Sequence, residues 1–464
     1  MKLKNLLMIK PKQLLFLFLC VGFNQTVILS QSLREKIGQM VWVSFNGTKL
    51  DDSVKTDLKK RNVGGIILFA GNISNPIQVK TLIDSIKSYS KTPSFVAVDQ
   101  EGGKVARLSS SNGFSDSYTA YTLGTTFNNE DSTRKSAATM AGWLKQCGFN
   151  VNLAPVADVN VNPASPAIGK LGRSFSQIPE NVFKHDQWFI NEFNKKNILT
   201  CLKHFPGHGS AAQDSHLGFT DISNTWTNSE LLPYQQLFKS GYQDIVMMGH
   251  LYNSYLDPVY PASLSKKVVS ELLRTQLGFN GTVITDGMAM QAITANYSFE
   301  NAVEYAVNAG DDILLYTTNI RNGSSLVKNV IDIIEQKINQ GKISAIRIDE
   351  SYKRIIQLKT KYGLITSIKE FVQSNIPEKF QLYQNYPNPF NPSTSISFQI
   401  NERAFISLVV FNSIGQIVSN LINEEISPGV HEIKFNGTLL SSGVYYYRLR
   451  VGNSIQTKKM LLIK

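Results

Sequence analysis

The chain has 464 residues, of which 42% are hydrophobic and 18% charged, so it can bury a large core and is neither disordered nor fibrous. At domain sizes of roughly 100 to 250 residues, this length predicts two or more folding units. The net charge of +12 comes from scattered lysines and arginines that form no stripe with interleaved aromatic residues, so we expect no nucleic-acid partner.

The first thirty residues have the pattern of an export signal. A lysine-bearing start precedes an apolar run over residues 14–23, which is shorter than the roughly 20 residues of a membrane span. We therefore expect residues 1–30 to be a cleaved signal peptide. The remaining chain keeps only Cys147 and Cys201, which cannot form a disulfide framework, and their apolar neighbours indicate buried free thiols.

Residues 32–364 alternate short apolar, β-branched runs with longer amphipathic stretches, which is typical of repeated βα units. The amphipathic stretches 77–89, 132–146, 182–195 and 299–309 are expected helices. Eight runs are expected strands: 40–45, 65–69, 95–100, 150–158, 199–205, 244–250, 282–286 and 311–316. Eight parallel strands with crossover helices predict an α/β fold, a closed (β/α)₈ TIM barrel, with a doubly wound open sheet as the alternative.

The composition changes after a last predicted helix at residues 351–363. We expect a linker over 365–379, and the proline- and asparagine-rich stretch YQNYPNPFNP then begins a region that cannot continue a helix. Short alternating runs follow at 395–400, 405–411, 431–435 and 443–451, separated by glycine-containing turns. This pattern predicts a small all-β, immunoglobulin-like sandwich over residues 380–464.

Polar residues cluster at the carboxyl ends of the predicted strands, where a (β/α)₈ barrel builds its active site. One such residue alone often only bonds a loop, but many converging on one rim indicate a site. Five end strands and three lie in the loops that follow strands four and five: Asp99, Lys203, His204, His250 and Asp286, then Arg173, Asp214 and His216.

The segment KHFPGHGSAAQDSHLGF is the densest of these clusters. Asp214 and His216 are two residues apart, which in extended chain puts them on one face, and an aspartate can then orient the histidine as a general acid and base. Two other interpretations remain open at this point. The loop could be simply solvated, or His204, His208 and His216, with Asp214, could bind a metal.

Asp286 ends the apolar run GTVITDGMAM, and a carboxylate fixed on a strand end suits a covalent nucleophile. Asp99 and Arg107, in VAVDQEGGKVARL, form the kind of pair that hydrogen-bonds sugar hydroxyls. Glu101 in the same segment could be a second catalytic carboxylate, but we interpret it as structural support.

Taken together, the segments VAVDQEGGKVARL, LAPVADVN, GRSF, KHFPGHG with DSH, VMMGH, PASLS and ITDGMAM resemble glycoside hydrolase family 3, and most of all its single-barrel β-N-acetylhexosaminidase branch, over residues 32–364. The resemblance implies that Asp286 is the nucleophile of a retaining mechanism and that His216 is the acid/base with Asp214 as its partner. It further implies binding of a terminal N-acetylglucosaminyl unit by a set of five residues, Asp99, Arg107, Arg173, Lys203 and His204.

Two departures from the family pattern bear on fine specificity. Lys104 stands where an arginine is common, and Gly287 and Met288 follow the nucleophile where an aspartate or alanine and a leucine are common. Many relatives carry a second α/β domain with a catalytic glutamate, for which this chain has no room, but the single-barrel branch carries its acid/base in its own loop.

The tail, from FQLYQNYPNPFNPSTSISF to KKMLLIK, resembles the type A C-terminal sorting domain of the type IX secretion system. Without that resemblance, Tyr445, Tyr446 and Tyr447 would suggest a carbohydrate-binding sandwich, although strand alternation turns Tyr446 away from its two neighbours. With the export signal, the tail implies the type IX machinery as a partner and a secreted or cell-surface location.

We therefore expect a secreted, exo-acting β-N-acetylhexosaminidase that needs no cofactor and no metal. Its substrates would be chitin oligomers, peptidoglycan fragments or glycoprotein glycans. The alternatives are a β-glucosidase or β-xylosidase of the same family, a metal-dependent hydrolase and a glycan-binding protein without catalysis. Phosphorolysis in place of hydrolysis is also open, because a neutral histidine repels phosphate less than a carboxylate does.

Overall fold

Eight short parallel strands form the centre of the larger folding unit. A computed structural model describes residues 31–215, 218–365, 380–400, 402–452 and 454–464, so the expected signal peptide and almost all of the expected linker lie outside the described residues. The barrel strands are β1 (Val41–Val43), β2 (Gly65–Leu68), β3 (Phe95–Val98), β6 (Val151–Asn152), β7 (Leu199–Phe205), β9 (Ile245–Met248), β11 (Thr282–Thr285) and β12 (Leu314–Tyr316).

The strands pair in chain order, and β12 returns to pair with β1. A parallel bridge between Ile284 and Ile313 joins the remaining neighbours, β11 and β12, so the sheet closes on itself. The (β/α)₈ prediction is confirmed, and the open doubly wound sheet is wrong. All eight predicted strand runs contain one of these strands, and every barrel-strand residue is buried, which explains why the runs read as continuous apolar segments.

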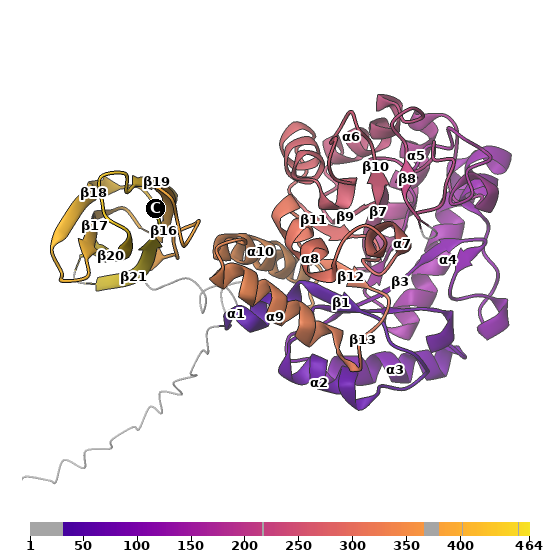
Figure 1. The fold of residues 1–464 in the computed structure, drawn as a ribbon. Coiled ribbons are helices and arrows are strands. Elements are labelled where there is room, and N and C mark those ends of the chain that lie inside the picture. The colour runs from indigo at the N-terminus through magenta and orange to yellow at the C-terminus, as the bar shows by residue number, and fades with distance from the viewer. Residues whose placement is uncertain (1–30, 216–217, 366–379, 401, 453) are drawn as a thin grey trace, which may run out of the picture.

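Helices surround the strands on the outside of the barrel (Figure 1). The described helices are α1 (Leu33–Gln39), α2 (Asp52–Lys60), α3 (Pro76–Tyr89), α4 (Glu130–Cys147), α5 (Pro179–Asn194), α6 (Leu232–Lys239), α7 (Gln291–Thr294), α8 (Phe299–Ala309), α9 (Leu326–Asn339) and α10 (Ala345–Lys361), with a π-helical segment, η7 (Lys267–Gln276). In α3 the Asn75 side chain caps the first turn, Pro76 occupies the first position, and the buried face repeats every three or four residues. None of the helices in the described ranges is long and apolar enough to span a membrane.

The C-terminal unit consists of two antiparallel sheets packed around their own core. One sheet has the order β15 (Phe380–Leu382), β16 (Ser393–Ile400) and β19 (Gly429–Asn436). The other has the order β18 (Ile417–Ile426), β17 (Ala404–Asn412), β20 (Gly443–Val451) and β21 (Ser454–Leu462). The sequence predicted four of these seven strands. It missed β18 because only one of its ten residues, Ile422, is buried, so no alternation marks the strand.

The tyrosine cluster on β20 follows the predicted alternation. Tyr445 and Tyr447 are buried in the sandwich core, whereas 37% of Tyr446 is exposed. The Tyr447 hydroxyl donates to the Tyr383 carbonyl at 2.7 Å and accepts from the Asn385 amide at the same distance. Core packing therefore accounts for two of the three tyrosines.

A buried lysine stands among uncharged groups at the amino end of the barrel. Lys359, on α10, donates from Nζ to Gln39 Oε1 at 2.5 Å and to the Gly64 carbonyl at 3.3 Å, and Nζ lies 4.8 Å from the centre of the Phe95 ring. Burial lowers the pKa of Lys359 to about 7. Its charged form is therefore disfavoured in the folded protein.

We expect the free energy of unfolding to depend on pH through Lys359. From about pH 7 to the usual pKa of lysine, the unfolded chain binds a proton that the folded protein does not, so this group makes the fold more stable as pH rises and costs stability below pH 7. The Lys359→Met variant lacks this titrating amine, so it lacks this contribution to the pH dependence. Chemical denaturation should show wild type gaining about 2 kcal/mol relative to the variant between pH 7 and pH 9.

The matched control is Lys353→Met, which removes an exposed lysine from the same helix. The difference between that variant and wild type should stay constant over the same pH range. Parallel pH curves for wild type and Lys359→Met would contradict the assignment of the effect to this buried ammonium group.

Candidate active site

A cavity of about 280 Å³ opens among the residues that end or follow the barrel strands, at their carboxyl ends. It is lined by six of the eight residues to which the family resemblance assigns a role: Asp99, Arg107, Arg173, Lys203, His204 and Asp286. Glu101 also lines it, together with apolar residues such as Phe69, Leu171 and Met290. Asp214 does not line this cavity, and His216 lies outside the described residues.

Two consecutive residues of β7 face the cavity, although side chains of a regular strand alternate between faces. The register of β7 against β9 shifts between Leu202 and Phe205, and this irregularity covers both Lys203 and His204. Bulges of this kind commonly re-aim side chains beside active sites. The local break in β7 therefore places a cation and an imidazole in one cavity.

Two carboxylates and two cations form a buried network on one wall of the cavity. The Lys203 ammonium group lies 2.8 Å from Asp99 Oδ1 and 2.7 Å from Glu101 Oε1. Glu101 also accepts two hydrogen bonds of 2.8 Å from the Arg173 guanidinium, in the bidentate geometry that fits a carboxylate. Arg107 completes the set with an ion pair of 3.2 Å to Asp99.

The network keeps both carboxyl groups ionised. Burial alone would raise the pKa of Asp99, but the positive charges of Lys203 and Arg107 outweigh it and the pKa lies below its ordinary value. Burial likewise opposes ionisation of Glu101, and Arg173 and Lys203 hold its pKa far below the usual range. Neither carboxyl can therefore supply a proton at neutral pH.

Asp158 follows β6 and fixes the imidazole of His204. Its Oδ2 lies 2.8 Å from His204 Nδ1, and its Oδ1 accepts the backbone N–H groups of His204 at 3.0 Å and His208 at 2.7 Å. Because a carboxylate only accepts, Nδ1 must carry the proton, and Nε2, 3.4 Å from Arg173 Nη2, is left as an acceptor toward the cavity. Asp158 was not among the residues predicted from the sequence, although it is an acidic residue at the end of a predicted strand.

Asp286 follows β11 and is held through its backbone and its neighbour. Its N–H donates to the Met248 carbonyl at 2.9 Å, and its Oδ1 accepts the N–H of Gly287 at 2.7 Å. His250 in turn lies with Nε2 3.0 Å from the Gly287 carbonyl and Nδ1 2.7 Å from Ser263 Oγ. His250 therefore positions Gly287, the residue after Asp286. His250 itself does not line the cavity.

The chain after β7 turns tightly before it reaches Asp214. Gly207 has a φ of 131°, and a Cβ there would meet Glu230 at 2.7 Å; a Cβ on Gly209 would lie 1.6 Å from the Val159 carbonyl oxygen. Glu230 Oε2 accepts the N–H groups of Gly209 at 3.1 Å and of the following residue at 3.3 Å. Only glycine fits these close approaches, which explains the two glycines of the PGHG segment.

Metal binding by this histidine-rich segment finds no support in the described geometry. Asp158 already engages His204 Nδ1, and His208 Nε2 lies 3.1 Å from Ser215 Oγ. Within the described ranges, which leave out His216, no group of three or more His, Cys, Asp or Glu side chains is arranged to hold a metal ion.

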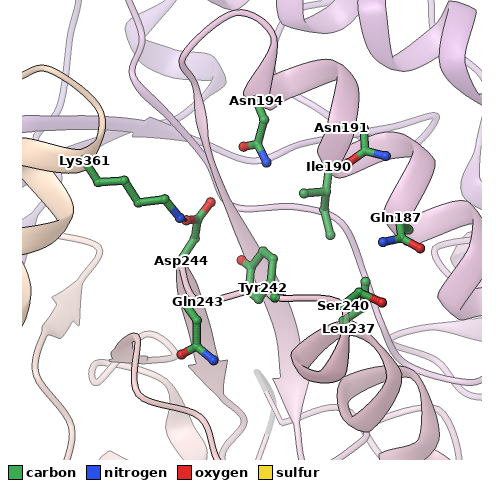
Figure 2. A pocket seen from close by; sticks show the side chains of 11 residues that line it. Gln187, Ile190, Asn191, Asn194, Leu237, Ser240, Tyr242, Gln243, Asp244 and Lys361 are labelled. Carbon is green, nitrogen blue, oxygen red and sulfur yellow. Dashed lines mark hydrogen bonds and ion pairs between the residues drawn. The ribbon is translucent and has the colours of Figure 1, made fainter.

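A smaller cavity of about 100 Å³ lies near the start of β9, at the amino end of the barrel (Figure 2). The Lys361 ammonium group lies 2.7 Å from Asp244 Oδ1 on one side of it, and the Tyr242 hydroxyl oxygen lies 2.8 Å from the carbonyl oxygens of both Thr200 and Ile245, which share its one proton. Asp244 and the Tyr242 hydroxyl are thus already engaged by protein groups. Residues at this end of a (β/α)₈ barrel serve stability more often than catalysis.

Comparison with known proteins assigns the larger unit to a family. The sequence profile of the glycosyl hydrolase family 3 N-terminal domain matches residues 32–358. The chain belongs to glycoside hydrolase family 3. A second profile, the secretion system C-terminal sorting domain, matches residues 384–464. Both resemblances found in the sequence are therefore confirmed.

Curated relatives in the family carry similar names. The chain is 32% identical to β-hexosaminidase A of Pseudoalteromonas piscicida over 343 residues, which is 68% of this chain and 56% of that protein. It is 33% identical to the β-hexosaminidase of Tolumonas auensis over 285 residues, 60% of this chain and 82% of that protein. The chain thus spans little more than half of the first relative and most of the second.

Solved structures of family 3 enzymes have the same fold. A β-N-acetylglucosaminidase from a Paenibacillus species superposes with a TM-score of 0.67 at 28% identity and covers 77% of this chain and 70% of its own. The β-N-acetylhexosaminidase of Beutenbergia cavernae gives a TM-score of 0.65 at 27% identity, with 71% of this chain and 98% of its own covered.

Asp158→Asn should lower glycoside hydrolysis by roughly 100-fold or more while the protein stays folded. An amide cannot accept hydrogen bonds at both of its ends, so His204 would lose the partner that fixes its tautomer. Initial rates and thermal melts measure the two effects separately. The matched control, Asp57→Asn, removes an equally buried carboxylate from α2 and should leave the rate unchanged; equal rate losses in both variants would contradict the role of Asp158.

Proposed function

We propose that the protein is an exo-acting, retaining β-N-acetylhexosaminidase that removes terminal N-acetylglucosamine from oligosaccharides. The observation that carries this proposal is the composition of the cavity: Asp286 lines it directly after β11, beside a wall in which Asp99 and Glu101 pair with cations. The names of the relatives and of the solved structures support the N-acetyl specificity. The cavity volume suits one terminal sugar unit better than an extended chain.

Asp286 is the proposed nucleophile. Its oxygen attacks the anomeric carbon as the bond to the leaving oxygen breaks, and a covalent glycosyl-enzyme forms through an oxocarbenium-like transition state. The hydrogen bond from Gly287 and the support of that residue by His250 hold the carboxylate on the rigid end of β11. A fixed nucleophile lowers the entropic cost of reaching the transition state.

His216, oriented by Asp214, is the proposed acid and base. It protonates the leaving oxygen in the first step and takes a proton from the attacking water in the second. The ionised state of Asp99 and Glu101 supports this assignment, because neither of those carboxyl groups can donate the proton. A histidine–aspartate pair thus replaces the second carboxyl group of the usual retaining glycosidase.

The remaining cavity residues are proposed to bind the sugar. Asp99 offers acceptor oxygens and Arg107, Arg173 and Lys203 offer donors, which match the alternating hydroxyl groups of a sugar. His204 presents Nε2 as a further acceptor. The substrate would be a chitin oligomer, a peptidoglycan fragment or a glycoprotein glycan that ends in N-acetylglucosamine.

The sorting domain indicates export across the outer membrane to the cell surface or the medium. We assign four segments: a signal peptide over 1–30, the catalytic domain over 32–364, a linker over 365–379 and the type IX sorting domain over 380–464. The ranges of the two family matches, 32–358 and 384–464, support this division. The type IX secretion machinery is the partner that the tail would engage.

The test compares initial rates on the 4-nitrophenyl β-glycosides of N-acetylglucosamine, glucose and xylose. We expect turnover of the N-acetyl substrate, and Asp286→Ala should reduce it about 1,000-fold or more because the covalent step is lost. A slowly released fluorinated substrate should label Asp286, which peptide mass spectrometry would detect. Wild type should keep its rate in the presence of a chelator.

Other outcomes would redirect the assignment. Preference for the glucoside or xyloside would overturn the N-acetyl specificity but keep the family. Loss of activity with chelator, restored by metal, would replace the covalent mechanism with a metal-dependent one. Binding of the N-acetyl substrate without turnover would make the protein a glycan-binding module.

A further inference from the structure

We infer that His208 is a positioning residue for Asp214, the proposed partner of the acid/base, and that it acts through a hydrogen bond to Ser215. Ser215 directly follows Asp214 in the chain, so fixing the place of Ser215 restrains Asp214. The inference rests on the proposed function, because it assigns His208 a role in delivering the proton.

The contact that carries the inference is buried at both ends. His208 Nε2 lies 3.1 Å from Ser215 Oγ, and 2% of His208 and 1% of Ser215 is exposed. Ala212 and Gln213, in contrast, are exposed, and Asp214 is half-buried. The chain therefore leaves the interior after Ala211, runs over the surface at Ala212 and Gln213, and returns to the interior at Ser215, where His208 contacts it.

The side chains of Asp158 and Glu230 hold the backbone at and after His208. Its backbone N–H donates to Asp158 Oδ1 at 2.7 Å, and the residues directly after it donate their N–H groups to Glu230. Asp158 also binds His204 in the cavity wall, and the His204 and His208 rings meet edge to face with their centres 5.7 Å apart. One carboxylate thus fixes the sugar-facing histidine and the histidine that contacts the acid/base loop.

Two features of the His208 ring fit a positioning role better than a catalytic one. Burial lowers the pKa of His208 to about 4, so the ring is neutral at the near-neutral pH at which a histidine acid/base works. The His208 side chain does not line the cavity. Its Nδ1 is buried and has no hydrogen-bond partner among the described residues, so the bond to Ser215 is the one that its ring makes there.

The experiment uses the dependence of rate on the leaving group. A poor leaving group, such as phenol, needs protonation by the acid, whereas 2,4-dinitrophenol departs without it. His208→Phe keeps a ring of similar size and removes the hydrogen bond. We expect kcat/KM on the phenyl N-acetylglucosaminide to fall about 10- to 100-fold, while kcat/KM on the 2,4-dinitrophenyl substrate stays within about two-fold.

The second step gives an independent readout. With the 2,4-dinitrophenyl substrate, release of the glycosyl-enzyme by water needs the base, so kcat should fall in His208→Phe. Azide attacks without giving up a proton and should restore kcat. Ser215→Ala should reproduce these effects, the double variant should add little to them, and His208→Gln, which can still bond Ser215, should recover part of the rate.

His185 is the matched control. It is a buried histidine on α5, its Nδ1 lies 2.8 Å from Thr133 Oγ1, and burial lowers its pKa to about 4 as well. His185→Phe should change kcat/KM equally little on both substrates. Thermal melts of both variants measure the structural cost of losing a buried histidine.

The outcomes separate the inference from the proposed function. If wild type hydrolyses neither substrate, the proposed function fails. If wild type is active but His208→Phe loses the same factor on both substrates, or azide restores nothing, the inference is overturned and His208 is only structural. A leaving-group effect without coupling between His208 and Ser215 would also overturn it, because the bond named here would not be the cause.

Discussion

The ammonium group of Lys203 sits almost fully buried between Asp99 and Glu101, and the shape of the cavity follows from that arrangement. A buried charge is costly unless it is paired, so the carboxylates at the end of β3 and the cation at the end of β7 must stay together. Arg173 and Arg107 bind the outer oxygens of the same two carboxylates. The ion network therefore links the end of β3, the end of β7 and the loop that holds Arg173, and it lines one wall of the cavity with hydrogen-bond donors and acceptors.

The same network also limits which chemistry the cavity can perform. Carboxylates held ionised by neighbouring cations bind hydroxyl groups well but release no proton, so the acid has to come from outside this wall. Under the proposed function, the acid is His216, in the loop that follows β7. Asp158, Glu230 and the close glycine contacts hold the first part of that loop, between β7 and Ala211, against the barrel. The cations of the wall keep its carboxylates ionised, and the backbone contacts hold the start of the loop in place. The proposed mechanism uses both features.

Most of the barrel could be predicted from the sequence because strands buried on both faces appear as continuous apolar runs, and polar residues such as Asp99 and Asp286 mark where they end. The register break in β7 could not be predicted, although it is what turns both Lys203 and His204 into the cavity. Asp158 was missed because two of its partners are backbone N–H groups some fifty residues away, which leave no trace in residue identity. In the tail, the sequence of β18 lacks the alternation of apolar and polar residues that marks its neighbours. Only Ile422 of this edge strand is buried, so packing places few demands on its residues.

The two thiols of the described chain have a consequence for a protein that crosses an oxidising compartment. Cys147 on α4 and Cys201 on β7 are both buried, and burial raises the pKa of Cys147 to about 11 and that of Cys201 still further above its ordinary value. Thiolates are the species that form mixed disulfides, so neither sulfur reacts readily once the barrel has formed. Trapping by an oxidant or an alkylating reagent would then mark only chains that have not finished folding. The fold itself protects the exported enzyme from wrong cross-links.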